Sequence, residues 1–410
     1  MNLFTSESVT KGHPDKICDQ IADRILDECL SQDKNSHVAC EVCCTTGTVV
    51  LMGEITTNAQ VDYKKVARDV LKEIGYTNPD YGIDAESCSV MDLIDKQSPE
   101  INNAVNNSLE RKSTVDGADV EDLDAQGAGD QGIIFGYACN ETKNYMPLTI
   151  YMADMLARRL ERVREEGIVN WLRPDGKTQV TVKYDGTGKI VCIDTILIST
   201  QHNPGVWYSD ICDDIIQRVI TPVIKELGIE NLINDLDTKF IINPSGSFTI
   251  GGPHGDTGLT GRKLAVDTYG GHAKFGGGAM SGKCPSKVDR SAAYMARYVA
   301  KHVVASGIAS KCEIQVSYAI GQATPVSINV DTFGTSVIPS DLLCTEISRI
   351  FDFRPLAIIK ELNLLAPQYY KTSSRCHFGN TVDSWEILNE DKLQELKDID
   401  VKYKSGYVAG

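Results

Sequence analysis

The sequence lacks the signals of exported and membrane-embedded proteins. Its N-terminus, MNLFTSESVTKGHPDK, has no cationic segment followed by an apolar core, so we expect no signal peptide. It also lacks any run of about 18 apolar residues, which argues against a membrane-spanning helix. The thirteen cysteines are an odd number in a chain without an export signal, and they favour reduced thiols in the cytoplasm.

Positive charge is scarce as well. The 41 Lys and Arg residues are outnumbered by 56 Asp and Glu residues, which gives a net charge of −15. This charge repels duplex nucleic acid and anionic membranes on average, so we predict neither as a partner. A polyphosphate substrate is still compatible with it, provided that basic residues cluster locally and a metal neutralises the remaining charge.

Common catalytic signatures are missing. No Ser-His-Asp order, HExxH motif or Rossmann fingerprint stands out. The one C-x-x-C pair, Cys40 and Cys43, lies in a strand-like run without a second pair. We therefore favour small buried side chains over a zinc site.

The sequence does contain a pattern that occurs three times. A β-branched strand, a Gly-containing turn, a second strand, a polar link and a helix follow one another from near residues 38, 178 and 312. The first two helices carry apolar residues on one face, namely Val66, Val70, Leu71 and Ile74, and Ile211, Ile215, Ile216, Val219 and Ile220. Such units are common and the three share little identity. Their recurrence over 410 residues nevertheless predicts an α+β fold of three similar domains, each a mixed sheet with helices on one side.

The predicted domain limits follow from this pattern. The run from Ser98 to about Gln126 is polar and rich in Asn and Asp, so it is either a mobile lid or a linker. We expect an N-terminal domain over 2–98, a loop over 99–126, a central domain over 127–234, a C-terminal domain over 235–380 and an extension over 381–410.

Five segments carry candidate functional residues. In SESVTKGHPDKICDQ, Pro14 starts a helix, so His13 and Asp15 lie at a helix N-terminus, where backbone N–H groups attract anions. His13 could polarise a leaving oxygen while Asp15 holds a metal, but taken alone a simple helix cap is the favoured interpretation. In GAGDQGIIFGY, Asp130 precedes an apolar strand, where a ligand contact and a tight turn are equally plausible.

Two further segments combine glycines with charge. Asp175 and Lys177 precede a strand, and Asp-Gly-Lys most often forms a turn. Six glycines between 246 and 261 surround Asp256 and lead to Arg262 and Lys263, which resembles a backbone cradle for anions. Phe248 stacks on a base or joins the core.

The fifth segment, GGHAKFGGGAMSGKCPSKVDRSA, nearly matches a nucleotide-binding P-loop at 270–290. Cys284 stands where that loop needs a Ser or Thr, and no buried strand precedes it, so the match is weak. Lys283 and Lys287 lead to Asp289, which we expect to cap the following helix. Together the five segments indicate nucleotide or polyphosphate chemistry with a divalent metal held by carboxylates.

The motifs also resemble a known family. GHPDK, GAGDQG, KTQVTV, STQH, GGPHGDTGLTGRK, VDTYGG, GGGAMSGK and KVDRSAAY occur in the order found in S-adenosylmethionine synthetases (methionine adenosyltransferases). The resemblance covers nearly the whole chain. It implies that the methionine sulfur displaces triphosphate from the ribose C5′ of ATP, and that the triphosphate is then hydrolysed to phosphate and diphosphate. A thioether has no proton to lose, so the first step needs no general base.

The resemblance also implies residue roles. His13 is similar to the residue that contacts the leaving oxygen. The implied ATP contacts are His13, Asp175, Lys177, Phe248, Asp256, Arg262, Lys263, Ala279 and Lys283. The implied methionine contacts are Glu54, Gln97, Asp256 and Lys287. Two magnesium ions per site are expected on Glu7, Asp15 and Asp289, and a potassium ion on Glu41. Asp130 lies near the substrates, and His13, Lys177, Arg262, Lys283 and Asp130 are the expected catalytic residues.

The resemblance leaves some points open. Ser247, Phe275, Met280 and Cys284 depart from the usual family residues, which puts nucleotide affinity and loop stiffness in doubt. The family's sheets pack flat across a dimer interface with active sites between subunits, so we expect a homodimer and allow a homotetramer. A non-catalytic regulatory paralogue and a methionine-independent NTPase are the rival interpretations, and the retained charged residues argue against the first.

Overall fold

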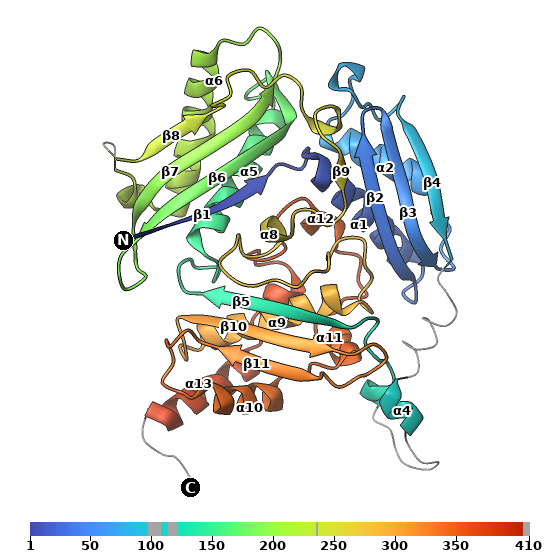
Figure 1. Cartoon of the computed structure of the whole chain (residues 1–410), viewed down its shortest axis with the longest axis vertical. Helices are drawn as coiled ribbons and strands as arrows, with labels where there is room; N and C mark the ends of the chain where they lie inside the picture. Colours follow the sequence, from blue (N-terminus) through green and yellow to red (C-terminus); the bar gives the residue numbers. More distant parts are fainter. Residues whose placement is uncertain (97–107, 114–121, 235–236, 405–410) are drawn as a thin grey trace.

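The chain folds around three β-sheets (Figure 1). The structure is a computed structural model, and it describes residues 1–96, 108–113, 122–234 and 237–404. The central sheet has the order β1-β6-β7-β8, formed by Asn2–Val9, Leu172–Tyr184, Ile190–His202 and Lys239–Ile242. The N-terminal sheet has the order β4-β3-β2-β9, formed by Ser89–Asp95, Thr48–Thr56, His37–Thr45 and Gly258–Leu259. The C-terminal sheet has the order β11-β10-β5, formed by Ser327–Asp331, Lys311–Tyr318 and Gly132–Cys139.

Helices cover one side of each sheet, as predicted. The N-terminal sheet packs on α1 (Pro14–Gln32) and α2 (Tyr63–Ile74). The central sheet packs on α5 (Leu148–Glu165), and α6 (Tyr208–Asp214) continues through a π-helical stretch (Ile215–Ile220) into α7 (Thr221–Leu227). The C-terminal sheet packs on α9 (Val288–Ala305) and α10 (Ser340–Ile350). The shorter helices and the C-terminal one are α4 (Leu109–Ser113), α8 (Leu264–Asp267), α11 (Pro355–Glu361), α12 (Tyr370–Ser373) and α13 (Glu390–Lys404).

The three sheets confirm the predicted repeat of hairpin and helix. Strands β2 and β3 precede α2, β6 and β7 precede α6, and β10 and β11 precede α10. Two sheets are mixed, because β3 pairs in parallel with β4 and β7 with β8. The described pairings of the C-terminal sheet are all antiparallel.

Each sheet also takes a strand from a distant part of the sequence. Strand β1 pairs with β6, from Asn2 opposite Tyr184 to Val9 opposite Lys177. Strand β5 lies beside β10, and β9 adds to the edge of β2. The three units are therefore tied together by β-pairing, and the contiguous domain limits given above remain a prediction.

Two apolar cores stabilise these layers. One core belongs to the central unit, and the other is shared by the N- and C-terminal units around α1 and α9. All thirteen cysteines are free thiols, and Cys40 and Cys44 point into the shared core from β2. No helix in the described part of the chain is long and apolar enough to cross a bilayer.

The close contact between β5 and α9 leads to a stability prediction. A Cβ atom at Gly136 would overlap the backbone carbonyl of Ala296. Gly136→Ala should therefore lower the free energy of unfolding by roughly 1–3 kcal/mol, the usual cost of overpacking. Urea unfolding measures it. As a control, Gly186→Ala has nothing within 4 Å of its new methyl group and should change stability by less than about 0.5 kcal/mol. Equal stabilities for the two variants would contradict this packing.

Candidate active site

The N-terminus of α1 holds His13 in a defined protonation state. His13 is the N-cap residue, and its Nδ1 accepts a hydrogen bond from the Asp15 N–H at 3.2 Å. Burial lowers the pKa of His13 to about 3, with help from the nearby charges of Lys263 and Lys177 and against that of Asp15. A neutral imidazole that accepts at Nδ1 carries its proton on Nε2. The cap predicted from the sequence is thus confirmed, and it leaves one N–H donor for a ligand.

Asp15 is fixed by three neighbours on the glycine-rich segment. Its Oδ1 accepts from the Leu259 N–H at 3.0 Å and its Oδ2 lies 2.6 Å from Lys263 Nζ. Arg262 Nε is 3.9 Å from Oδ1. Burial opposes ionisation, but the bonds from Lys263 and Leu259 outweigh it and lower the pKa of Asp15. The carboxylate is therefore ionised and buried beside two cations.

Asp175 lies within a strand, so the interpretation of Asp-Gly-Lys as a turn was wrong. It belongs to β6, at an irregularity in the pairing with β7. Its Oδ2 accepts from the Gly252 N–H at 2.8 Å, whereas Oδ1 is buried without a hydrogen-bond partner. The Oε1 atom of neighbouring Gln201 is also buried without a hydrogen-bond partner. Two buried acceptors without donors are costly, so this corner fits a ligand that brings donors.

Burial raises the pKa of Asp175 to about 6, although the Gly252 N–H and the Lys177 charge oppose the rise. The charge of Asp256 adds to it. Phe248 is half-buried, and its ring lies 2.8 Å from a Cβ placed at Gly251. We name this group the α1 cluster, and it comprises His13, Asp15, Asp175, Lys177, Phe248, Asp256, Arg262 and Lys263.

A second group forms around the start of α9. Lys283 Nζ lies 2.6 Å from Asp289 Oδ2. Asp289 is in the first turn of α9, where Lys287 is the N-cap and no side-chain cap bond is made, so the predicted capping by Asp289 was wrong. A Cβ atom at Gly278 would overlap the Asp289 carboxylate, which explains a glycine there.

Two acidic residues, Glu41 and Glu54, lie near Lys283. Partial burial raises the pKa of Glu41. The Lys283 charge opposes this rise and the Glu54 charge adds to it. The side chains of Glu41, Glu54 and Lys283 therefore lie close together. The GAGDQG segment also lies here, since the Gly129 N–H donates to Ser286 O at 3.1 Å. We name this group the loop cluster, and it comprises Glu41, Glu54, Asp130, Ala279, Lys283, Lys287 and Asp289.

The two clusters lie at different points along the same elements. Strand β9, which binds Asp15, pairs with Cys43 and Cys44, whereas Lys283 bridges to Ala39 on the same edge of β2. Four residues of strand span roughly 14 Å. Along α1, Asp15 contacts Leu259 and Asp23 contacts Gly282, and eight residues of helix span about 12 Å. Along both elements, the points that anchor the two clusters are farther apart than an ion pair can reach.

Not every predicted residue joins a cluster by a direct contact. Glu7 lies on β1 opposite Gln179 and diagonal to Lys177, on the exposed side of the central sheet. The expectation that Glu7 and Asp15 hold one magnesium ion together therefore remains a prediction. Ala279 lies against Gly261, where the two glycine-rich loops meet. Gln97 and most of the predicted loop at 99–126 fall outside the described residues.

Sequence reasoning missed the residues that hold these loops. Asp19 accepts from the Gly261 N–H at 2.9 Å and Asp23 from the Gly282 N–H at 2.8 Å. Both are fully buried on α1, and Arg290 of α9 binds Asp23. The spacing of Asp15, Asp19, Asp23 and Asp27 at every fourth residue was the available clue, because it places all four on one side of a helix.

Comparison with known proteins decides the family. Three domains of S-adenosylmethionine synthetase match this chain: the N-terminal domain over residues 1–99, the central domain over 125–248 and the C-terminal domain over 250–387. The chain belongs to the S-adenosylmethionine synthetase family. It is a methionine adenosyltransferase, which makes S-adenosylmethionine from ATP and methionine.

The four departures from the usual synthetase residues have different settings. Met280 and Cys284 are buried in the shared core, and the Cys284 N–H donates to Val38 O at 3.0 Å. Ser247 and Phe275 are exposed on the loops. Two departures thus pack into the core, and two are exposed to solvent.

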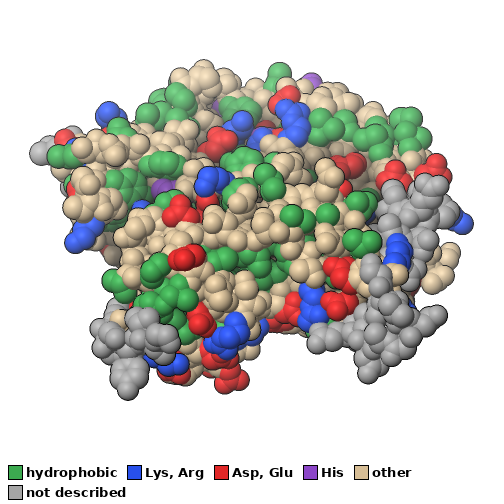
Figure 2. Space-filling view, turned by 60° about the horizontal axis from the view of Figure 1, so that its bottom comes forward, with side chains coloured by type: hydrophobic (Ala, Val, Ile, Leu, Met, Phe, Trp, Pro, Cys, Tyr) green, Lys and Arg blue, Asp and Glu red, His purple; other side chains and the backbone are tan. Residues whose placement is uncertain are grey.

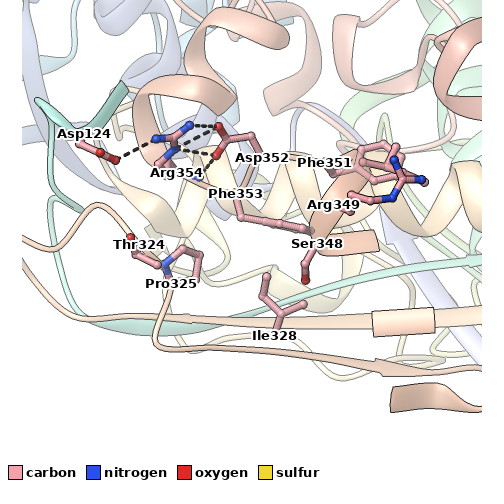
Figure 3. A pocket seen from close by; sticks show the side chains of 11 residues that line it. Asp124, Thr324, Pro325, Ile328, Ser348, Arg349, Phe351, Asp352, Phe353 and Arg354 are labelled. Atoms are coloured by element: carbon pink, nitrogen blue, oxygen red, sulfur yellow. Dashed lines mark hydrogen bonds and ion pairs between the residues drawn. The ribbon is translucent and has the colours of Figure 1, made fainter. Parts of the chain in front are cut away.

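A separate cavity of about 540 Å³ lies near α10 and α11 (Figure 3). Its two arginines already have acidic partners: Arg354 pairs with Asp124 and Asp352, and Arg349 pairs with Glu346 and Glu395. Residues of neither cluster line it. It therefore adds nothing to the synthetase site.

The raised pKa of Asp175 gives a testable pH dependence. A folded pKa of about 6 against an ordinary 3.8 means that the folded state holds this proton more tightly. Asp175 then lowers the free energy of unfolding as pH rises from about 4 to about 6, by up to ~1.4 kcal/mol per pH unit. Asp175→Asn keeps an acceptor for Gly252 and removes the charge. The variant should gain stability over the parent across that range and keep a constant difference above it.

Urea unfolding of parent and variant between pH 4.5 and 7 measures this difference, in the absence of substrate. A difference that stays the same at every pH would show that Asp175 does not titrate abnormally.

Proposed function

We propose that the α1 cluster of one subunit and the loop cluster of a partner subunit enclose one ATP and one L-methionine. The separation of the clusters within a single chain supports this. The implied ATP contacts are divided between them, because Lys263 and Asp175 belong to one and Lys283 to the other. A second copy related by twofold symmetry brings unlike clusters together at two equivalent sites.

The observation that carries the proposal is a pair of matched ion pairs. Lys263 with Asp15, and Lys283 with Asp289, each place an ammonium 2.6 Å from a carboxylate oxygen. A magnesium triphosphate carries both complementary charges. Each lysine can exchange its carboxylate for phosphate oxygens while each carboxylate takes a cation, so charge stays balanced throughout. Such preorganised charge is the main source of catalysis where a polyanion departs.

The first step follows from this arrangement. The methionine sulfur attacks ribose C5′, the C5′–O bond breaks, and the triphosphate leaves with the bonding electrons. His13 is neutral and presents Nε2–H, so it donates a hydrogen bond to the departing oxygen without gaining or losing a proton. Lys177, Arg262, Lys263 and Lys283 hold the triphosphate. The rate then depends on alignment of sulfur and carbon and on stabilisation of the polyanion.

The remaining substrate contacts are assigned by the same division. Asp175, with its unpartnered Oδ1, and Phe248 bind the nucleoside end of ATP, and Ala279 lines the phosphate path. Glu54, Gln97, Asp256 and Lys287 bind methionine, where the carboxylates also favour the sulfonium that forms. Asp130 lies beside the loop carrying Lys287. In the second step the same cations retain the triphosphate while it is hydrolysed to phosphate and diphosphate.

The carboxylates suit the expected metals. Among the described residues of one chain, no group of three or more His, Cys, Asp or Glu forms a metal cage. Magnesium commonly binds through one or two carboxylates plus substrate phosphates, so Asp15 and Asp289 with ATP are a fitting donor set. We assign two magnesium ions per site to these residues, with Glu7 as an added carboxylate, and a potassium ion to Glu41. When bound, these cations neutralise the charge of the triphosphate.

Surface composition supports an assembly of at least two chains. Exposed apolar side chains occur on strands of all three sheets, at Leu3, Met91, Leu93, Ile133 and Leu259. Figure 2 shows further hydrophobic side chains exposed among charged ones. We propose a homodimer through the open sheet faces, with a homotetramer as a further step. The free thiols support a cytoplasmic location, and segment 99–126 is assigned as the lid.

Replacing Asp15 tests the metal assignment. Asp15→Asn should raise the magnesium concentration needed for half-maximal synthesis by at least the roughly 10–100-fold that loss of a supporting residue costs a metal site. Mass spectrometry of the sulfonium product, at saturating ATP and methionine, measures it. Asp69→Asn is the matched control, since its carboxylate forms an ion pair with exposed Lys65 on the surface of α2. A magnesium titration of the Asp15 variant that overlays the control would remove Asp15 from the metal site.

A further inference from the structure

A buried ion pair joins α1 to the first turn of α9. Arg290 NH1 donates to Asp23 Oδ1 at 2.8 Å and NH2 donates to Oδ2 at 2.6 Å. Both side chains are fully buried. The charges are thus satisfied by each other in a planar, two-point contact, the geometry that fixes position best.

The same two side chains also bind the backbone on either side of the Lys283 α-carbon. Asp23 Oδ1 accepts from the Gly282 N–H at 2.8 Å, and Arg290 NH1 donates to Lys283 O at 3.0 Å. From the other side, the Cys40 N–H of β2 donates to Gly282 O at 2.8 Å. Gly282 has φ +79° and a Cβ there would overlap Cys40 O, so only glycine lets the loop approach β2 this closely.

Arg290 directly follows Asp289, the partner of Lys283. The guanidinium of Arg290 therefore contacts the backbone of Lys283, and Arg290 is the residue next to Asp289, the ion-pair partner of Lys283. Asp23 lies two turns along α1 from Asp15, so the same helix carries Asp15 of the first pair and the Asp23 anchor of the loop that bears Lys283. The two anchoring contacts are therefore spaced along α1.

We infer that Asp23 and Arg290 are positioning residues that hold Lys283 and Asp289 at the separation needed to receive the triphosphate. The inference rests on the proposed role of Lys283. Neither residue touches substrate, since both are enclosed. Their effect comes from placement, and a displacement of about 1 Å in a catalytic group can cost about a hundredfold in rate.

The alternative is that this pair merely stabilises the fold, and α9 supplies a matched control. Arg297, two turns further along, also forms a two-point contact, from Nε and NH2 to Glu386 at 2.8 and 3.1 Å, and both residues are fully buried. Arg297 also donates to backbone carbonyls, those of Tyr137, Asn144 and Tyr145. These carbonyls lie in β5 and the segment after it, away from the Lys283 loop.

The test combines Arg290→Lys with Lys283→Ala in a double-mutant cycle. Lysine keeps the charge at position 290 but cannot bind Asp23 and Lys283 O in the same fork. Lys283→Ala alone should lower kcat by roughly 100–1000-fold, as loss of one preorganised donor does. Arg290→Lys should lower kcat by roughly tenfold or more in the parent and by less than about threefold when Lys283 is already alanine.

Arg297→Lys, in the same two backgrounds, should change kcat by one and the same factor in both. All variants are assayed as full-length protein below their unfolding temperatures. An Arg290→Lys loss that is equally large in both backgrounds, or no larger than the Arg297→Lys loss, overturns the positioning role while leaving Lys283 catalytic. A parental kcat for Lys283→Ala instead overturns the proposed role of Lys283, and the inference with it.

Asp23→Asn supplies a second route if Arg290→Lys fails to fold. Its side-chain oxygen still accepts from Gly282, but it binds Arg290 more weakly. The expected result is the same dependence on Lys283, and an equal kcat loss with and without Lys283 contradicts the inference.

Discussion

Helix α1 organises the site through carboxylates placed one turn apart. Asp15, Asp19 and Asp23 accept backbone hydrogen bonds from Leu259, Gly261 and Gly282, and Asp27 accepts three more from Gln368, Tyr369 and Tyr370. Glycine-rich loops have few side chains with which to fix their own shape, so their conformation is set by acceptors supplied from outside. A straight helix provides those acceptors at a constant interval of about 6 Å, four residues at 1.5 Å each. The aspartates of α1 thus fix the backbone of the loops that carry Arg262, Lys263 and Lys283.

This constraint explains why the site is ready before substrate arrives. The lysines that we propose hold the triphosphate, Lys263 and Lys283, each lie 2.6 Å from an aspartate oxygen, so binding would exchange partners instead of burying bare charge. His13 is kept neutral by burial beside cations, so its Nε2–H can donate a hydrogen bond without any proton being transferred. The chemistry fits, because a sulfur nucleophile and a phosphate leaving group require electrostatics more than proton transfer.

The local parts of this description were accessible from the sequence. Alternating and 3.6-residue periodicities are local, so the three hairpin–helix units and the helix start at Pro14 could be predicted. The pairing of β1 with β6 and of β5 with β10 could not be predicted, because these strands are far apart in the sequence. The same limit applies to Asp175, whose Asp-Gly-Lys setting resembles a turn until the partner strand β7 is known. Asp23 and Arg290 are 267 residues apart, and nothing local to either predicts their contact. Asp289 looked like a cap because its partner, Lys283, was not known to fold back on it.

The division of charge between two separate clusters is the central claim, and mixing two inactive variants tests it most directly. Chains carrying Lys177→Ala, in the α1 cluster, are unfolded and refolded together with chains carrying Lys283→Ala, in the loop cluster. If each site joins unlike clusters from two subunits, a mixed dimer has one site with both substitutions and one with neither. Random pairing should then restore about a quarter of parental synthesis. If the site is complete within one chain, every site keeps one substitution. Activity no higher than that of the separate variants would contradict the account.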